Sequence, residues 1–258
     1  DTDGISIYDA MKSYGLDPEV IEQAKWPEGS IGSFLEAHIE QGPVLDAENI
    51  ELGLVDCIVG IQRYMVTVHG RADHAGTTPM DMRLDAVDAA TKVISKIPDW
   101  AREKGAGTVA TTGYIKTTPG GMNIVAEKVE FTVDIRSTNN DYINDITSKI
   151  RAALDYETEK MGGSYEMDNK LTITPVDLSE EMLQIMEDDC KEKGYSCKRL
   201  PSGAGHDALE IGQVIPTVML FVPSKDGRSH CPVEHTEYSE FAKASVIMNG
   251  LAQKLLAR

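Results

Sequence analysis

One continuous block of the sequence, from Gln62 to about Pro175, most constrains the fold because it carries the strand and helix patterns of a whole small domain. Apolar and polar side chains alternate along residues 64–68 and 125–135, and a period of two is typical of a strand with one buried face. A β-rich stretch, residues 108–116, precedes the second of these strands and ends in a Pro-Gly turn. These segments predict three strands of one sheet.

Two helices fit between the predicted strands. Apolar residues recur at helical spacing over residues 84–97, where Pro98 is expected to end the helix, and again over residues 143–154. A last strand is predicted over residues 165–174. The order βαββαβ is typical of a four-stranded antiparallel, ferredoxin-like sheet with two helices on one face.

The segments on either side of this block have α/β character. Residues 34–40 alternate in the manner of a strand, which places His38 between Glu36 and Glu40 on one face. Further strands are predicted over residues 56–60, 195–200 and 214–222. A helix is predicted after Ser179, a residue type that caps helices well.

We therefore expect an α/β protein of two domains. Residues 62–176 would form an inserted lid and dimerisation domain. Residues 1–61 and 177–258 would form the two pieces of the other, catalytic domain. These outer pieces offer few strands for an α/β domain, so the catalytic domain is expected to be partial.

Charge and hydropathy exclude several classes of partner. The chain has 25 Lys and Arg against 42 Asp and Glu, a formal net charge of -17, and nucleic-acid phosphates require the opposite sign. The longest apolar stretch, residues 214–222, contains Pro216 and is too short to cross a bilayer. The polar, acidic start of the chain does not resemble a signal peptide, and the cysteines form no CxxC motif. We expect a cytoplasmic protein with reduced thiols and no nucleic-acid or membrane partner.

Four of the six histidines lie in polar, glycine-rich or strand-end contexts, where an imidazole could bind a metal ion or carry a proton. They are His38, His74, His206 and His230. Each of them, taken singly, is more often a surface or core histidine, and their spacing matches no short zinc motif such as HExxH. The local context alone therefore assigns no site.

Five motifs occur in a fixed order along the chain. They are His-Ile-Glu-Gln-Gly-Pro at His38, His-Ala-Gly-Thr-Thr-Pro-Met at His74, Gly-Gly-Met-Asn-Ile-Val with a following Asp-Ile-Arg, Ser-Gly-Ala-Gly-His-Asp-Ala ending around His206, and Ser-His-x-Pro-x-Glu at His230. Together they resemble the N-carbamoyl-L-amino acid hydrolase, allantoate amidohydrolase and β-ureidopropionase family of the zinc aminopeptidase and aminoacylase superfamily. The resemblance runs across nearly the whole chain.

The resemblance implies a centre of two Zn²⁺ or Mn²⁺ ions, with His38 as a ligand of one ion and His230 as a ligand of the other. It implies that His74 reaches from the lid into the active site of the partner subunit of a homodimer. There His74 would stabilise the oxyanion of the tetrahedral intermediate.

The resemblance also implies residues that bind the substrate. Asn123 and Arg136 would hold it from the lid, and an arginine suits a carboxylate because its guanidinium donates two parallel hydrogen bonds. Gln41 and the backbone around Gly205 and His206 would make further contacts.

The family's metal site needs more ligands than these motifs supply: an upstream His-x-Asp pair, a bridging Asp and a Glu-Glu pair. Residues 1–33 contain no histidine, so we expect the sequence to be N-terminally truncated relative to the family. Two imidazoles fall below the three protein ligands usual for catalytic zinc. We therefore expect this chain alone to be inactive.

The expected function is that of a metal-dependent amidohydrolase acting on linear C–N bonds of carbamoyl or ureido groups, first of all an N-carbamoyl-L-amino acid hydrolase. Allantoate amidohydrolase and a non-catalytic dimerisation or binding fragment are the alternatives. A peptidase or aminoacylase of the wider superfamily is a third, which the motifs at His74 and His206 disfavour. Three single residues also keep alternative interpretations of their role. Arg136 could be a surface ion-pair residue, Glu234 could orient a histidine ligand or merely precede a helix, and Asp207 could orient His206 or cap a helix.

Overall fold

The computed structural model describes residues 4–105 and 107–257. The chain divides into two compact units, one that ends at Ser33 and one that begins at Phe34. The first unit contains helix α1 (Ile7–Ser13) and the short 3-10 helix η1 (Pro18–Ala24). Both have capped beginnings, but neither helix contains a buried residue, and residues 4–33 form no buried core.

The second unit contains two sheets, and the first sheet is built from strands that are distant in the sequence. Its strands are β1 (Phe34–Ile39), β2 (Leu52–Ile58), β8 (Val176–Asp177), β9 (Cys197–Ser202) and β10 (Thr217–Val222). Their order is β1-β10-β2-β8, with β9 paired to β2. Strand β1 runs parallel to β10, and β10 runs antiparallel to β2. This sheet therefore joins chain segments from both sides of the predicted insertion.

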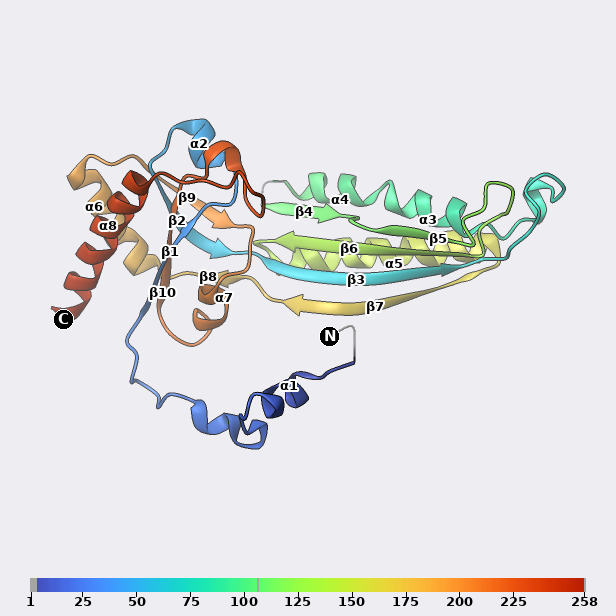
Figure 1. The fold of residues 1–258 in the computed structure, drawn as a ribbon. Helices are drawn as coiled ribbons and strands as arrows, with labels where there is room; N and C mark the ends of the chain where they lie inside the picture. The colour runs from blue at the N-terminus through green and yellow to red at the C-terminus, as the bar shows by residue number, and fades with distance from the viewer. Residues whose placement is uncertain (1–3, 106, 258) are drawn as a thin grey trace. The chain divides into compact units, whose positions relative to one another are not determined.

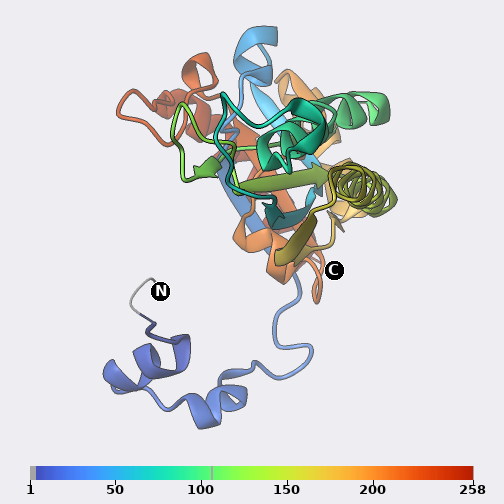
Figure 2. The ribbon, with the colours of Figure 1, turned by 90° about the vertical axis from the view of Figure 1, so that its right-hand side faces the viewer.

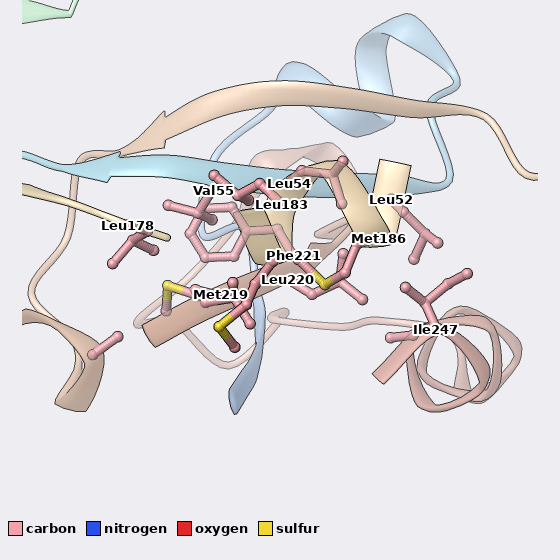
Figure 3. Packing of buried hydrophobic residues seen from close by; sticks show 14 of the residues in the cluster. Leu52, Leu54, Val55, Leu178, Leu183, Met186, Met219, Leu220, Phe221 and Ile247 are labelled. Atoms are coloured by element: carbon pink, nitrogen blue, oxygen red, sulfur yellow. The ribbon is translucent and has the colours of Figure 1, made fainter. Parts of the chain in front are cut away.

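Helices α6 (Glu180–Lys193) and α8 (Tyr238–Leu256) pack with this sheet (Figure 1). Every residue of β10 is buried, which agrees with its continuous apolar run. Figure 3 shows the core, where Leu183 and Met186 of α6 and Ile247 of α8 gather with Phe221 of β10. Two short helices, α2 (Val44–Glu48) and α7 (Asp207–Ile211), follow β1 and β9 along the chain.

The second sheet lies within the block that resembles a complete domain. Its strands are β3 (Gly60–His69), β4 (Thr108–Thr111), β5 (Ile115–Thr118), β6 (Lys128–Ser137) and β7 (Ser164–Ile173). The order is β4-β6-β3-β7, with β5 also paired to β6, and all pairs are antiparallel. This order is that of the predicted ferredoxin-like sheet, but the sheet has five strands and not the predicted four, because the stretch predicted over residues 108–116 divides into β4 and β5.

Three helices cover one face of the second sheet: α3 (Ala86–Ile94), α4 (Ile97–Lys104) and α5 (Asn140–Met161). The side chains of Tyr64, Val66 and Val68 point from β3 into a core shared with these helices. Figure 2 shows α5 nearly end-on beside the strands. The intervening residues of β3, including the exposed Arg63, face away from that core and leave the opposite face uncovered by these helices.

The prediction that Pro98 ends the first helix of this block is wrong. Helix α3 ends at Ile94, and Pro98 lies in the first turn of a second helix, α4. Proline is well accepted there, because the first N–H groups of a helix have no partner within the helix and its fixed φ suits the helix start. The predicted single helix is therefore two.

The α/β fold class is confirmed, and the strands predicted around His38 and in the inserted block are all present. The domain boundaries at 61/62 and 176/177, and the role of the second sheet as a lid, stay predictions. Between residues 4 and 257, leaving out residue 106, no helix is long and apolar enough to cross a membrane.

Candidate functional site

A cleft of about 880 Å³ lies where the first sheet meets the near end of the second sheet. Its lining comes from the turn after β1, the loop after β9, the segment before His230, and the end of β6. Predicted site residues that line it are Gln41, Arg136 and His230. Gly203 and Ala204 also line it, and the predicted Gly205 is the next residue of the same loop.

His38 and His206 lie next to each other beside this cleft. His38 is in β1, where it pairs in register with Phe221 of β10. The His206 ring lies 4.6 Å from the His38 ring, edge to face, and 5.7 Å from the Phe221 ring. The structure thus brings together a predicted metal ligand and a predicted substrate contact that are far apart in the sequence.

His206 is held in a neutral state by its surroundings. Burial, and then the neighbouring His38, lower the pKa of His206 to about 4. Its Nε2 lies 2.7 Å from the hydroxyl of Ser202. A neutral imidazole can donate one hydrogen bond and accept another, so His206 acts as a polar contact and not as a cation near neutral pH.

Gln41 and His230 meet across the cleft. Both have left-handed backbone conformations, with φ of 59° and 56°, which non-glycine residues adopt at a cost. The amide Nε2 of Gln41 lies 3.4 Å from Nε2 of His230 and 3.4 Å from the hydroxyl of Ser229. The backbone N–H of Gln41 donates to the hydroxyl of Ser224 at 3.0 Å, which fixes this turn to the end of β10.

Glu234 fixes the backbone at His230. One carboxylate oxygen of Glu234 accepts from the His230 N–H at 3.0 Å and from the Ser229 hydroxyl at 2.6 Å. The same two donors lower the pKa of Glu234 below its ordinary value. The sequence allows Glu234 either to orient a histidine ligand or merely to precede a helix. The first interpretation is nearer to the structure, but Glu234 orients the main chain of His230 and not its ring.

The two glutamates that flank His38 in the sequence bind elsewhere. Glu36 accepts from the N–H of Ala208 at 2.9 Å, at the start of α7, where the N-cap residue His206 makes no side-chain capping bond. Glu40 accepts from the N–H groups of Val44 and Leu45, both at 2.8 Å, at the start of α2. Each carboxylate therefore anchors a loop of the site, a role that the alternating pattern did not predict.

Arg136 is tied to both sheets. Its Nε and Nη2 donate to the two oxygens of Asp134 at 2.7 and 3.2 Å, and its Nη1 donates to the carbonyl of Gly203 at 2.7 Å. Burial favours a raised pKa for Asp134, but the bonds from Arg136 and Arg63 outweigh it and lower that pKa. Three of the five N–H groups of Arg136 are used in this way. Asp134 was missed as a partner, although it lies two residues away on the same strand face.

His74 and Asn123 do not lie at the cleft. They sit on two loops at the far end of the second sheet, joined by an isolated bridge between His74 and Ile124 and by a bond from Ala75 N–H to the Asn123 carbonyl. Strand β3 separates them from the cleft, and its 10 residues span about 33 Å. His74 is exposed, and its Nδ1 accepts from the N–H of Gly76 at 3.0 Å.

His38 has the form that a metal ligand requires. Its Nδ1 lies 2.8 Å from the Ile39 carbonyl, which can only accept, so Nδ1 carries the proton and Nε2 has a free lone pair. Within the part of the chain that the structure describes, however, no three His, Cys, Asp or Glu side chains gather in a way that could hold a metal ion. The described residues therefore offer single ligands and not a complete centre.

Comparison with known proteins confirms the resemblance. Residues 11–254 match the profile of peptidase family M20/M25/M40. The chain is 36% identical over 248 residues to an N-carbamoyl-L-amino-acid amidohydrolase of Paenarthrobacter aurescens, a match covering 96% of this chain and 60% of that protein. It is 34% identical over 243 residues to the allantoate amidohydrolase of Escherichia coli K12, covering 94% and 59%.

A solved structure gives the same result. The chain superposes with a TM-score of 0.84 and 29% identity on an amidase of the hydantoinase/carbamoylase family from Burkholderia multivorans, covering 97% of this chain and 60% of that one. The chain thus spans about 60% of the length of the relatives it matches.

Proposed function

Because this chain belongs to peptidase family M20/M25/M40, we propose that it forms part of a metal-dependent amidohydrolase that cleaves linear C–N bonds of carbamoyl or ureido groups on small acids. The observation that carries the proposal is the convergence of Gln41, Arg136 and His230 on one cleft, beside the paired rings of His38 and His206. These residues come from four separate segments of the chain.

N-carbamoyl-L-amino acids are the substrates that we propose first. Among the described residues, the bonds of Arg136 to Asp134 and Gly203 leave one N–H on each Nη without a partner, and both can meet a substrate carboxylate. Gln41 offers its amide, and the neutral His206 offers a polar contact without a competing positive charge. Allantoate also carries a carboxylate and ureido groups, so it is the second candidate, supported by a relative of that name.

We place one ligand of each ion of a two-metal centre at His38 and His230. Since the described residues do not supply three ligands together, the remaining ligands would come from the part of the amidohydrolase relatives that this chain does not match. On this proposal the chain by itself is not a competent hydrolase.

The second sheet and its helices are proposed as a lid and dimerisation domain. His74 is the residue that motivates this, because it lies about 33 Å along β3 from its own cleft. The Gly76 N–H occupies Nδ1, so the neutral ring carries its proton on Nε2 and can donate outward. In a homodimer that donor, with Asn123 beside it, would bind the developing oxyanion in the partner subunit.

The test measures bound metal and turnover on the same sample. The chain is loaded with zinc or manganese, analysed for metal, and assayed with N-carbamoyl-L-amino acids and with allantoate. It is assayed again after mixing with a segment that supplies the part of the relatives it does not match. We expect less than two ions per chain and turnover only in the mixture.

A pair of histidine variants controls the metal measurement. His38→Ala should lower metal binding, whereas His235→Ala, which removes an exposed histidine paired with Glu237, should not. Two ions per chain together with turnover would contradict only the claim that the chain by itself is inactive. Equal metal binding by both variants would contradict the ligand role of His38. If the chain and the added segment form a complex that hydrolyses neither substrate, a non-catalytic binding module would remain as the function.

A further inference from the structure

A groove of about 700 Å³ lies on the face of the second sheet that the helices leave uncovered. Its lining includes Arg63 of β3, Asp134 and Arg136 of β6, Tyr114, and Lys170 of β7. Val109, Arg136 and Gly203 line both this groove and the cleft described above. The groove is therefore an extension of the cleft, with Arg136 at the point where the two meet.

The groove is cationic in a strongly acidic protein. Arg63, Arg136 and Lys170 contribute three positive charges, and Asp134 and Asp168, which lies 3.6 Å from Lys170, contribute two negative ones, so the group carries +1 while the whole chain carries -17. Burial favours a raised pKa for Asp134, but its two arginine partners outweigh it and lower that pKa, so Asp134 remains ionised near neutral pH and is shared by two guanidinium groups. A local excess of positive charge in such a chain attracts anions to this groove.

The two arginines are held as a pair by Asp134. Arg63 lies directly opposite Asp134 in the β3–β6 register, and its Nε donates to Oδ2 at 2.7 Å. Arg136 donates from Nε to Oδ1 at 2.7 Å. Because one carboxylate contacts both guanidinium groups, the two arginines flank Asp134 on the same face of the sheet.

Arg63 also retains most of its donors. The bond to Asp134 is the only side-chain hydrogen bond of Arg63 within residues 4–105 and 107–257, and it uses Nε alone. Both Nη groups therefore remain available, on a side chain that is 47% exposed. Asp134 fixes the direction of the guanidinium, which reduces the entropy lost when an anion binds.

We propose that Arg63, with Lys170 lining the same groove, forms a second anion subsite that receives the side-chain carboxylate of a dicarboxylic carbamoyl substrate. This inference rests on the proposed function, in which Arg136 binds the α-carboxylate. It narrows the substrate class to carbamoyl derivatives of acidic amino acids, the smallest being N-carbamoyl-L-aspartate. A monocarboxylic substrate would leave Arg63 facing water.

The test compares two ligands of nearly equal shape, N-carbamoyl-L-aspartate and N-carbamoyl-L-asparagine, together with succinate. Each is titrated into the 258-residue chain, and the Nε–Hε signals of Arg63 and Arg136 are followed by NMR. We expect the aspartate compound to bind about three- to fivefold more tightly than the asparagine compound, as suits a partly exposed ion pair. The signals of both arginines should move.

Three variants separate the subsite from general charge effects. Arg63→Met should bring the ratio of the two affinities to about one, and Lys170→Met should reduce it without removing it. Lys149→Met removes a positive charge from α5, on the helical side of the sheet, and should leave the ratio unchanged. Thermal unfolding of each variant identifies any that fails to fold, and Arg63→Gln then replaces Arg63→Met.

The outcomes distinguish the two proposals. The subsite would be overturned if the wild-type chain bound N-carbamoyl-L-aspartate and N-carbamoyl-L-asparagine equally well, or if Arg63→Met left the ratio of these two affinities unchanged. It would also be overturned if succinate left the NMR signal of Arg63 unmoved. If succinate binds as tightly as N-carbamoyl-L-aspartate and moves both arginine signals, the subsite stands and the carbamoyl specificity of the proposed function fails.

Discussion

Gln41 and His230 lie 189 residues apart in the sequence, yet both adopt left-handed backbone conformations and their Nε2 atoms lie 3.4 Å apart. Two turns with unfavourable backbone geometry thus face each other across the candidate site. Such strain persists only where the surroundings fix it, here through the Ser224 hydroxyl on one side and the Glu234 carboxylate on the other.

The strain at Gln41 can be measured with two substitutions. Gln41→Gly and Gln41→Ala both remove the amide that contacts His230, but only glycine adopts a φ of 59° without cost. We expect Gln41→Gly to be more stable than Gln41→Ala by about 1 kcal/mol. Urea denaturation at pH 7 measures the difference. Equal free energies of unfolding would mean that the turn relaxes when the side chain is removed.

The role of Glu234 can be measured at the amide that it binds. Glu234→Ala removes the acceptor of the His230 N–H, so the hydrogen exchange of that amide should become faster. Glu234→Gln keeps an oxygen acceptor and should preserve part of the protection. Hydrogen exchange followed by NMR reports both. Unchanged protection in Glu234→Ala would mean that the turn does not depend on the carboxylate.

His206 should make stability depend on pH. Its pKa is about 4 in the folded chain, below the ordinary value of 6.5, so the unfolded chain binds a proton at a pH where the folded chain does not. The stabilising effect is fully present above pH 6.5 and is lost as the pH falls toward 4. Urea midpoints between pH 7 and pH 4 should fall more steeply for the wild type than for His206→Gln.

A matched histidine controls this measurement. His235 is exposed, so His235→Gln should keep the wild-type pH dependence, and carboxylates that titrate over this range contribute alike to all three proteins. Parallel curves for the wild type and His206→Gln would show that His206 is not held neutral by the fold.

Asp134 should stabilise the uncovered face of the second sheet. Asp134→Asn keeps the shape but removes the charge that two arginines share, so we expect a loss of about 1–2 kcal/mol at pH 7. Since the pKa of Asp134 is lowered in the folded chain, this contribution is present above the ordinary pKa of 3.8 and is lost as the pH falls further. Denaturation of both proteins at pH 7 and pH 3 would reveal it, because the gap between them should narrow at the lower pH.

The second sheet was the most predictable part of the fold. Apolar and polar side chains alternate along β3 and β6, which places Val66 and Phe131 in one core. That core lies within the continuous block predicted as a domain, so the local pattern and the tertiary structure agree. Pro98 was misread because a proline that ends one helix and a proline that begins the next leave the same local signal.

Several predicted site residues meet at one cleft, but the residues that hold them in place were not predicted. Motifs identified His38 and Gln41, yet Glu36 binds an N–H 172 residues away, and no local pattern specifies such a partner. Asp134 was within reach of sequence reasoning, because residues two apart on a strand share a face and Arg136 is such a neighbour. The register with β3, which adds Arg63, required the structure.

The unbroken pairing of β3 with β6 also limits how the length of this chain can change. All 10 residues of β3 pair with β6 without a bulge, so an insertion in one strand needs an equal insertion in the other to keep the ladder. An odd number of added residues would turn Arg63 or Arg136 into the helical core, because successive side chains alternate between faces. Insertions that keep this β3–β6 register would therefore come in matched, even steps, and each step of two residues would carry the His74 loop about 7 Å further from the cleft.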